Sequence, residues 1–502
     1  MTFIQKIKNF YSMDLRLLSI FRIALGLIIL SDLVLRSFSL TEFYTDSGFL
    51  PRDIYIEHFW RSWFTSIYMS SGDPLIIKLL FTINAVIALA FTFGYKTKIN
   101  TILVWFFLVS LHNRNIYVLN GGDVELRILM FFAMFLPLGA RYSIDSKNNQ
   151  NYSNKTISNP VTFCYTLQIA LIYFVTAYLK TGDLWVKDFT AIYYTLSLDQ
   201  FTTPLASLIY EKENLLKFGT IITLIVEKYG PLLFIIPFFS KHIKAFGIFL
   251  MISFHINLML FMELGLFPFI CIAAFIPLIP SYIFDYIENI LKLPKKYYTN
   301  SKEKLKIQNI LSYIIIVGIF SIIITDNIVN TYYEISKNKK SKEEKVEKIF
   351  RIPSKVRSVI RYTRTSQDWG MFAPNPTRAD GFFKIKGRFN DKEFKDVFKI
   401  NNPVEYNVKQ PDNYYDHFPI PKNRWRKWMQ RVREDKENIL INQMSGSYCR
   451  RWKKHHKSEL QTISVKYFSQ VNLANYKKPK TKEINMWNHW CKKEYKKFFN
   501  KK

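Results

Sequence analysis

The sequence has few cysteines and lacks any set of residues with metal-ligand spacing. Four cysteines among 502 residues are too few for a disulfide scaffold. Cys164 and Cys271 lie inside apolar runs, where cysteine is typically a small buried hydrophobe. Cys449 and Cys491 could pair only if the C-terminal part faces an oxidising compartment, which their spacing does not decide. His, Cys and carboxylate residues do not recur at ligand spacing, so no bound metal is expected.

Three further features are missing, and each argues against a class of protein. The polar start "MTFIQKIKNFYSMDLR" runs into an apolar segment without a small-residue cleavage site, which is typical of a cytoplasmic tail rather than a cleaved signal peptide. Internal repeats are not visible, so a transporter with inverted repeats is the least favoured function. A recognised nucleic-acid module is also missing, and no nucleic-acid partner is expected.

What the sequence does have is an apolar first part and a basic last part. The chain is 49% hydrophobic and 17% aromatic, yet its formal charge is +31. Residues 331–502 hold 42 Lys and Arg against 18 Asp and Glu, so +24 of the +31 lies there. We therefore predict a transmembrane helical domain at 1–330, a charged linker or helix at 331–360, and a basic α+β domain at 361–502.

Within the last part, two patterns predict regular structure. The stretch "GFFKIKGRFNDKEFKDVFKI", residues 381–400, alternates apolar and polar residues around a turn at Asn390 and Asp391, which predicts a β-hairpin. The later stretch "NRWRKWMQRVRED" has helical spacing. The extramembrane domain is therefore expected to be small and of mixed α+β type.

Apolar segments in the first part approach the length that a helix needs to cross a bilayer, about 20 residues. The third and fourth are short, so the predicted count is eight or nine. The fold class is thus an all-α polytopic membrane bundle with a small C-terminal extramembrane domain. The segments run roughly over residues 17–35, 75–93, 101–111, 124–138, 160–179, 218–239, 245–261, 265–284 and 307–324.

Basic residues in short loops predict the orientation, because they resist translocation. With the N-terminus in the cytoplasm, four basic loops fall on the cytoplasmic side; they contain Lys6 and Lys8, Lys96 and Lys98, Lys241 and Lys244, and the cluster at 292–306. Nine spans then place the basic C-terminal domain outside the cytoplasm, whereas an even count would reverse it. The predicted location is a multi-pass plasma membrane, the inner membrane of a bacterium.

Charged residues inside spans are informative, because each costs roughly 2.5 to 3.5 kcal/mol on insertion. Arg22 could form an ion pair with Asp32 or with a neighbouring helix, or could contact a cofactor. Asp123 and Arg127 are four residues apart on one helix face, so a local pair is the plain interpretation. Both are also candidates for cofactor binding.

Two residues further along could carry protons. Glu227 lies in mid-span before Pro231, which removes a backbone hydrogen bond. This carboxylate could hold a proton, or could simply pair with Lys228 or Arg22. His255, in "SFHINLML", is either a satisfied core histidine or a proton carrier.

Lys180 ends a long apolar run in "YFVTAYLKTGDLWVKD". A lysine at the end of a span commonly extends its amine toward the headgroups. The functional alternative is desolvation, because burial disfavours the ammonium form and gives a neutral amine that can accept a proton. General-base lysines are made in this way.

The membrane part contains a series of stretches that occur together in a known family: "FRIALGLIILSDLVLR" with "FYTDSGFLPRD", "NGGDVELRILMFFAMFLPLG", "YFVTAYLKTGDLWVKD" and "SFHINLMLFMELGLFPFICIAAF". In this order they resemble the HTTM domain, the membrane domain shared with vitamin K-dependent γ-glutamyl carboxylase. Two later stretches, "SQDWGMFAPNPTRADGFFKIKG" and "GSYCRRWKKHH", are similar to its bacterial branch. Together the similar stretches cover most of residues 14–400.

The resemblance implies a chemistry. In the carboxylases a lysine in a "K-L-x-x-x-W" setting deprotonates vitamin K hydroquinone, and Lys180, five residues before Trp185, matches it. His255 matches a family histidine near the active site. The implied cofactor is vitamin K hydroquinone or another quinol, used with oxygen and carbon dioxide to carboxylate glutamate. Two differences stand out: "GGDVELR" replaces a family histidine, with His112 the nearest one, and a short basic tail replaces the propeptide-docking region.

Two functional hypotheses follow. The first is a quinol-dependent, peptide-modifying membrane enzyme of the lyase type, with Lys180 as base and with His255 and Glu227 as proton partners. Its cofactor-binding candidates are Arg22, Asp123, Arg127 and Trp185. The alternative is a non-catalytic membrane scaffold, an export factor or an immunity factor for a secreted peptide. Both hypotheses have the lipid bilayer and a secreted peptide or protein as partners.

Overall fold

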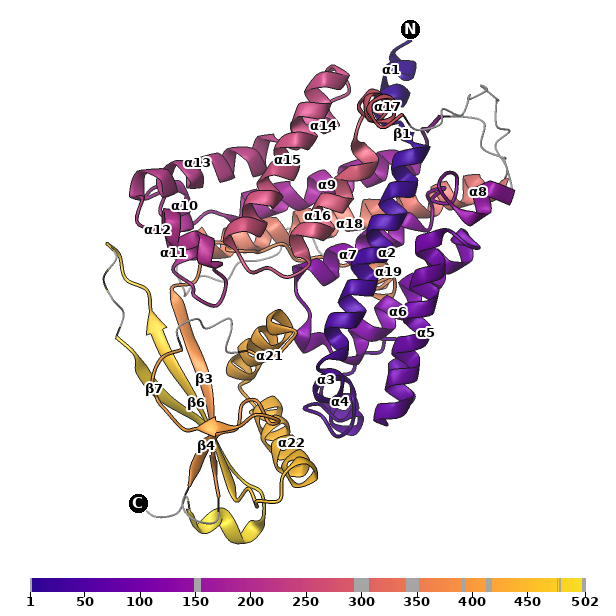
Figure 1. The fold of residues 1–502 in the computed structure, drawn as a ribbon. Coiled ribbons are helices and arrows are strands. Elements are labelled where there is room, and N and C mark those ends of the chain that lie inside the picture. Colours follow the sequence, from indigo (N-terminus) through magenta and orange to yellow (C-terminus); the bar gives the residue numbers. More distant parts are fainter. Residues whose placement is uncertain are drawn as a thin grey trace.

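The computed structural model describes residues 2–148, 155–292, 307–339, 352–389, 393–411, 418–475, 477 and 480–498. Most of these residues form helices, and a five-stranded sheet packs with two helices against one end of the helical part (Figure 1). The N-terminus and the sheet lie at opposite ends of the molecule. This agrees with the predicted helical bundle followed by a small mixed domain.

The longer helices of the bundle carry most of its apolar residues, and short helices and turns join them. The long helices are α2 (Leu15–Ser37), α5 (Pro74–Phe93), α6 (Thr97–Arg114), α7 (Gly121–Ala133), α9 (Pro160–Leu179), α13 (Glu213–Tyr229), α15 (Lys241–Phe261), α16 (Phe267–Phe275), α17 (Ser281–Ile290) and α18 (Ile307–Lys339). The short helices are α1 (Phe3–Phe10), α3 (Leu40–Tyr44), α4 (Arg52–His58), α8 (Ile144–Asn148), α10 (Asp183–Val186), α11 (Ala191–Leu196), α12 (Ser207–Tyr210), α14 (Leu232–Ile235) and α19 (Ser354–Tyr362). Short 3₁₀ turns are η1 (Ile67–Met69), η2 (Ile116–Val118), η3 (Pro204–Ala206) and η4 (Ile276–Leu278), and the small strands β1 (Met13–Asp14) and β2 (Thr156–Ile157) pair.

Six stretches of the described chain are long and apolar enough to cross a membrane, or seven if α16 with η4 and the bent α17 form one span. The predicted count of eight or nine is not confirmed. The third and fourth predicted segments do form helices, α6 and α7, but α7 has only 13 residues and α6 has polar ends. The six are Leu15–Ser37, Pro74–Phe93, Pro160–Leu179, Glu213–Ile235, Lys241–Phe261 and Ile310–Asn338.

Local sequence sets where these helices begin and end. Helix α5 begins after Asp73, whose carboxylate accepts the backbone N–H groups of residues 75 and 76, and has a proline in its first turn. It ends at Gly94, whose φ of +69° favours glycine. A side chain there would also lie 2.8 Å from the Arg22 guanidinium, so the glycine permits a close approach.

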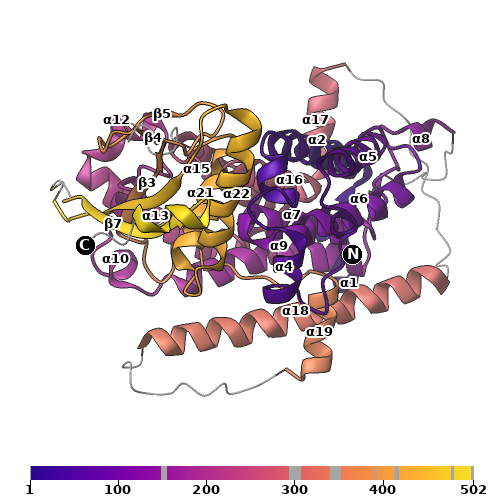
Figure 2. The ribbon, with the colours of Figure 1, turned by 90° about the horizontal axis from the view of Figure 1, so that it is seen from below.

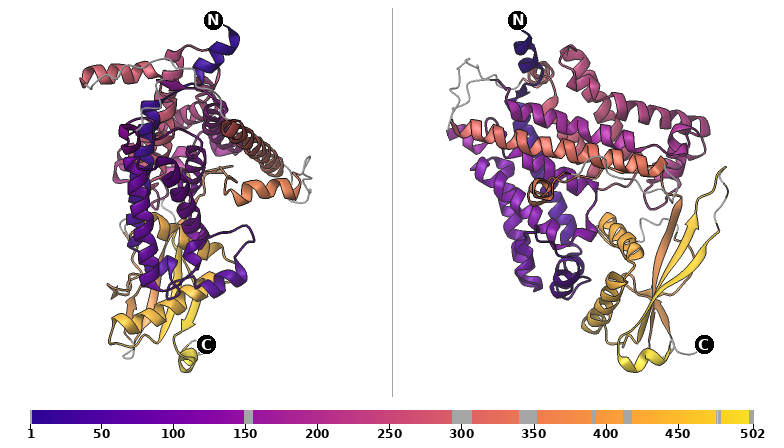
Figure 3. Two further views of the ribbon diagram at one scale, coloured as in Figure 1. Left: turned by 90° about the vertical axis from the view of Figure 1, so that its right-hand side faces the viewer. Right: turned by 180° about the vertical axis from the view of Figure 1, so that it is seen from behind.

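Helix α18 lies along the outside of the bundle and packs on α9 (Figures 2 and 3). Ile316, Phe320 and Ile323 are buried, while Ile310 and Ile314 are exposed. An apolar surface on both faces is typical of a helix with protein on one side and lipid on the other. The helix runs to Lys339 and so continues past residue 330, while the charged residues 340–351 lie outside the described residues.

The C-terminal sheet is antiparallel, with the order β5-β4-β3-β6-β7. The predicted hairpin is confirmed as β3 paired with β4, while its turn at Asn390 and Asp391 lies outside the described residues. Helix α21, predicted from its spacing, buries Trp425, Trp428 and Val432. The bounds are β3 (Ala379–Arg388), β4 (Phe394–Asp396), β5 (Val404–Glu405), β6 (Thr462–Val471), β7 (Lys482–Trp490), α21 (Lys422–Glu434), α22 (Ile439–His455) and η5 (Lys493–Phe498).

Helices α21 and α22 lie between the sheet and the bundle (Figure 1). Their buried side chains belong to the same apolar core as the ends of α2 and α3, and Trp428 lies 6.1 Å from Phe43 between ring centres. The C-terminal domain is therefore fixed to the bundle by a shared core.

Candidate functional site

Lys180 lies in the protein interior rather than among lipid headgroups. It is the residue that caps the C-terminus of α9, and it is 5% exposed. Its Nζ forms an ion pair with the carboxylate of Glu227, from α13, and lies 4.6 Å from the centre of the Trp185 ring. The structure therefore brings together three of the predicted site residues, from three elements.

The ion pair changes the expected chemistry of the amine. Both side chains are almost fully buried, at 4% and 6% exposed, so each needs the other to compensate its desolvated charge. The sequence argument considered burial of the amine alone and did not include the carboxylate that lies beside it.

His255 reaches the same face of α9 through Tyr173. Its Nε2 lies 2.6 Å from the Tyr173 hydroxyl, and both residues are buried. Tyr173 precedes Lys180 by seven residues, so the two share a helix face about 10 Å apart along the axis. The Nδ1 atom of His255 has no hydrogen-bond partner within the part of the chain that the structure describes.

A second buried polar atom without a partner lies on α7. The Oε2 atom of Glu125 has none among the described residues, and the side chain is 2% exposed. A Cβ on Gly122, one turn earlier, would contact Ile270 of α16, so this face of α7 packs on α16. The interior thus offers free polar atoms from two helices.

The segment 367–375, which we call the strap, covers the loop that follows Lys180. Its backbone carbonyls accept two hydrogen bonds: Phe372 from the Trp185 indole at 2.9 Å, and Pro374 from the N–H of Gly182 at 3.0 Å. The Asn375 side chain accepts a third, from the N–H of Leu184, at 3.1 Å. The strap belongs to "SQDWGMFAPNP", noted in the sequence for its resemblance but not as part of a site.

The other end of the strap is fixed to α9. Gln367 and Gln168 exchange two amide hydrogen bonds of 3.0 Å, and the indole of Trp369 donates to Gln367 at 2.7 Å. Trp369 is fully buried. The strap therefore contacts both α9 and the loop that follows Lys180.

A pocket of about 50 Å³ lies beside this loop. Its lining comes from the bundle and from the turn after β6, and includes Phe189, Tyr193, Tyr194 and Asn475. Tyr193 and Tyr194 belong to the same apolar cluster as Trp185. The pocket is thus continuous with the packing around the ring that contacts Lys180.

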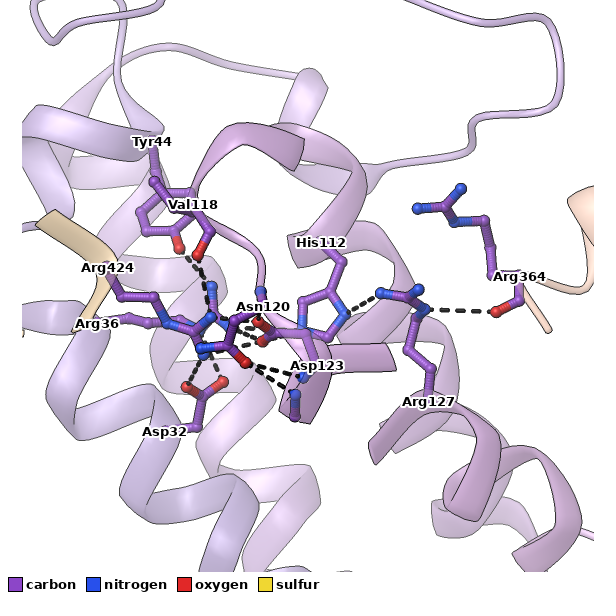
Figure 4. A network of polar contacts seen from close by, with 11 residues as sticks. Asp32, Arg36, Tyr44, His112, Val118, Asn120, Asp123, Arg127, Arg364 and Arg424 are labelled. Atoms are coloured by element: carbon purple, nitrogen blue, oxygen red, sulfur yellow. Dashed lines mark hydrogen bonds and ion pairs between the residues drawn. The ribbon is translucent and has the colours of Figure 1, made fainter. Parts of the chain in front are cut away.

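Asp32, Arg36 and Asp123 form a buried network in a different part of the bundle (Figure 4). The Arg36 guanidinium donates to Asp32 at 2.6 Å, to Asp123 at 2.5 Å and to the Tyr44 hydroxyl at 2.7 Å. Arg424 of α21 then donates to Asp32 at 2.9 Å and to both carboxylate oxygens of Asp123. The network therefore joins the bundle to the C-terminal domain.

Asp123 and Arg127 do not form the local pair predicted from their spacing. The structure places His112 between them: its Nδ1 is 3.1 Å from the Arg127 guanidinium, and its Nε2 is 3.2 Å from Asp123 (Figure 4). Because a guanidinium can only donate, Nδ1 accepts and Nε2 carries the hydrogen. His112, the nearest histidine to the altered family motif, is thus neutral and part of this network.

Arg22 pairs with neither Asp32 nor Glu227 in the described structure, so that prediction is wrong. Its guanidinium donates to backbone carbonyls, at 2.7 Å to Leu138 and at 2.5 Å to Tyr142. Its Nε also donates at 3.3 Å to the Thr92 carbonyl, in the last turn of α5, where carbonyls lack a partner within the helix. Leu138 and Tyr142 lie between α7 and α8, so Arg22 is a structural residue that joins the end of α5 to that segment.

One set of side chains could hold a metal ion by geometry, although none is expected from the sequence. Ligand atoms of Asp32, His112 and Asp123 lie within 4.8 Å of one another. Both carboxylates, however, are bonded by Arg36 and Arg424, and a metal would need to displace these guanidinium groups.

Two carboxyl groups meet where the bundle contacts β3. Asp380 accepts hydrogen bonds from the N–H of Asp199 at 2.7 Å and from the Gln200 amide at 3.0 Å. Burial and the nearby Asp199 carboxylate raise the pKa of Asp380 to about 7, and burial also raises the pKa of Asp199. The contact is therefore sensitive to pH near neutrality.

We expect the stability of the folded chain to fall as pH rises toward 7. The folded state keeps the Asp380 proton up to about pH 7, whereas the unfolded chain releases it near pH 4. Between these pH values the folded state binds more protons than the unfolded chain. The free energy of unfolding therefore falls as pH rises, by at most about 1.4 kcal/mol per pH unit. Thermal unfolding measured from pH 5 to 8 should show an unfolding temperature that falls with pH in the wild type, and Asp380→Asn should remove this dependence. Equal slopes in both proteins would contradict the assignment.

Sequence reasoning missed Tyr173, Gln168, Asn375 and Arg424. Tyr173 had a signal, because its seven-residue spacing from Lys180 places both on one helix face. The others had none, since their partners lie far away in the sequence: Arg424 and Asp32 are separated by 392 residues.

Comparison with known proteins gives one match. A family model described as the HTTM domain matches residues 10–281, which is more than half of the chain. The match includes Lys180, Glu227 and His255 but ends before the strap and the C-terminal sheet. None of the curated proteins and none of the solved structures matches the chain.

Proposed function

The chain belongs to the HTTM domain family, and from this premise we propose that it is a membrane enzyme that modifies a secreted peptide, with Lys180 as its base. The observation that carries the proposal is the buried Lys180 and Glu227 pair against the Trp185 ring. Burying an ion pair inside an apolar bundle costs desolvation free energy, and ionisable residues at such positions commonly mark a site.

A quinol fits the residues around this pair. The interior offers the amine, the phenol of Tyr173, the free Nδ1 of His255 and the free Oε2 of Glu125, together with aromatic rings. When bound with oxygen and carbon dioxide, a quinol would supply the strong base and the carbon source for carboxylating glutamate. Arg22, Asp123 and Arg127 bind protein groups, so the proposal gives them no cofactor contact.

The residues of the chain then have defined roles. Lys180 passes its proton to Glu227 and becomes a neutral amine, which accepts a proton from a ligand hydroxyl. The Tyr173 and His255 pair, two turns along α9, holds a second mobile proton. The strap and the Trp185 ring exclude water from the amine, which strengthens each of these interactions.

The C-terminal domain is proposed to face outward from the plasma membrane. Cys449 and Cys491 form a disulfide, which is typical of an oxidising compartment, whereas Cys164 and Cys271 are buried and free. The N-terminus, with its basic residues, lies at the opposite end of the molecule (Figure 1). This placement supports the predicted cytoplasmic N-terminus.

Removing the disulfide should lower the free energy of unfolding by about 4 kcal/mol, because the bond closes a loop of 42 residues. Cys449→Ser and Cys491→Ser, measured by thermal unfolding in detergent, should have equal effects. The thiols of the denatured wild type from membranes test the location: Cys164 and Cys271 should react with maleimide without reduction, and Cys449 and Cys491 only after it. Reaction of Cys449 and Cys491 without reduction would place the domain in the cytoplasm.

The function itself is tested by mass spectrometry of secreted peptides from cells that carry the chain. We expect a peptide whose glutamate has gained one carboxyl group, present with the wild type and absent with Lys180→Ala at equal membrane abundance. If no peptide changes mass in either strain, the alternative function, a non-catalytic scaffold, export factor or immunity factor, is favoured instead.

A further inference from the structure

The Lys180 site extends beyond the matched family domain. The loop that carries the base runs from Lys180 through Gly182 to Trp185. Two of its N–H groups and its indole donate to the strap. Residues 367–375 thus supply hydrogen-bond acceptors that the matched part, residues 10–281, does not.

The contact at Gly182 is close. A Cβ added to Gly182 would lie 2.2 Å from the side-chain atoms of Asn375, far nearer than atoms can approach. Asn375 therefore fills the space that a side chain at 182 would need. The same side chain accepts the hydrogen bond from the Leu184 N–H, so Asn375 contacts the loop at two positions.

The Trp185 ring transmits this constraint to the base. Its indole N–H donates to the Phe372 carbonyl, which fixes the plane of the ring. The ring centre lies 4.6 Å from the Lys180 Nζ, a distance at which an aromatic face stabilises an ammonium group. Moving the strap would turn the ring and alter the surroundings of the amine.

We propose that Asn375 and Gln367 are positioning residues of the Lys180 site, and that the strap holds the base in its buried place. The purpose of this placement rests on the proposed function. The placement itself does not, because it can be measured without substrate. It makes the last third of the chain a part of the site rather than an appendage.

The test measures how fast Lys180 reacts with an amine reagent in purified full-length protein in detergent, with mass spectrometry of the Lys180 peptide. A buried amine reacts when the loop opens, so the rate follows the open population. We expect Asn375→Ala to raise the rate about fivefold, the change that loss of one hydrogen bond produces. Asn375→Asp keeps the acceptor oxygen and should stay near the wild type.

Asn472→Ala is the matched control. Asn472 also ties the C-terminal domain to a bundle loop, by donating to the Ser197 carbonyl at 2.6 Å, but it does not touch the Lys180 loop. Its rate should equal that of the wild type. Equal rates in Asn375→Ala and Asn472→Ala, whether raised or not, would overturn the proposal.

A second pair of variants keeps the test decisive if Asn375→Ala does not fold. Gly182→Ala should raise the labelling rate, because its Cβ displaces Asn375. Gln367→Ala removes the amide pair with Gln168 that fixes the other end of the strap, and it should also raise the labelling rate. Labelling rates near that of the wild type in both Gly182→Ala and Gln367→Ala would show that the strap does not hold the loop. If the strap variants raise the labelling rate of Lys180 but no carboxylated peptide is found, the role of the strap stands and the proposed reaction is rejected.

Discussion

Lys180→Ala should abolish product formation and destabilise the bundle. The activity should fall by about 10²-fold to 10⁴-fold, the usual contribution of a general base. The free energy of unfolding should fall by about 3 to 5 kcal/mol, because Glu227 is left buried without a cation. Peptide mass spectrometry measures the first effect, and thermal unfolding of the detergent-solubilised protein measures the second.

A double variant separates catalysis from support of the fold. Lys180→Met with Glu227→Leu removes both charges and fills the space, so stability should return to near the wild-type value. Activity should stay absent, because no amine remains. Lys228→Ala is the control beside Glu227: its ammonium lies over exposed tyrosine rings, 5.6 Å from Tyr178, so little change is expected. An active double variant would refute the role of Lys180 as base.

Arg424→Ala should be the most destabilising change outside the Lys180 site. It leaves Asp32 and Asp123 in the interior with Arg36 as their shared guanidinium partner. Breaking a buried pair typically costs about 3 to 5 kcal/mol. Because Arg424 lies on α21, the loss should also release the C-terminal domain from the bundle. Thermal unfolding and sensitivity of residues 352–498 to protease measure the two effects.

Arg431→Ala is the matched control on the same helix. Arg431 pairs at 2.9 Å with Glu434, and both side chains are about two-fifths exposed. Exposed pairs contribute at most about 1 kcal/mol, so this variant should unfold near the wild-type temperature. Arg424→Lys should fall between Arg424→Ala and the wild type, because an ammonium keeps the positive charge but does not form the paired hydrogen bonds of a guanidinium. Equal losses for Arg424→Ala and Arg431→Ala would contradict the role of the network.

Much of the fold could be predicted from the sequence, because apolar length and alternation are local signals. The helix that ends at Lys180 and the hairpin of β3 with β4 follow directly from such patterns. The number of spans could not be settled in this way. Helices α6 and α7 bury polar residues against protein, so their composition does not separate a span from a buried helix.

Three residues noted in the sequence lie together in the structure, but how they pair could not be predicted. Lys180, Glu227 and Trp185 each drew attention by position or resemblance, yet the partners suggested for Glu227 were Lys228 and Arg22. Spacing along one helix cannot say which residue of another helix it faces. Arg424 shows the limit of such sequence reasoning. It lies in a strongly basic stretch that is typical of a solvent-exposed surface, yet the packing of α21 buries it.

The distance along the chain between Asp32 and Arg424 has a consequence for biogenesis. Helices α2 and α7 leave the ribosome hundreds of residues before α21 does, since Arg424 follows Asp32 by 392 positions and Asp123 by 301. Throughout that interval the nascent bundle carries two aspartates that share Arg36 alone. Assembly is therefore finished only when the final third has folded and docked, and we expect chains that stop short of α21 to be cleared by membrane quality-control proteases.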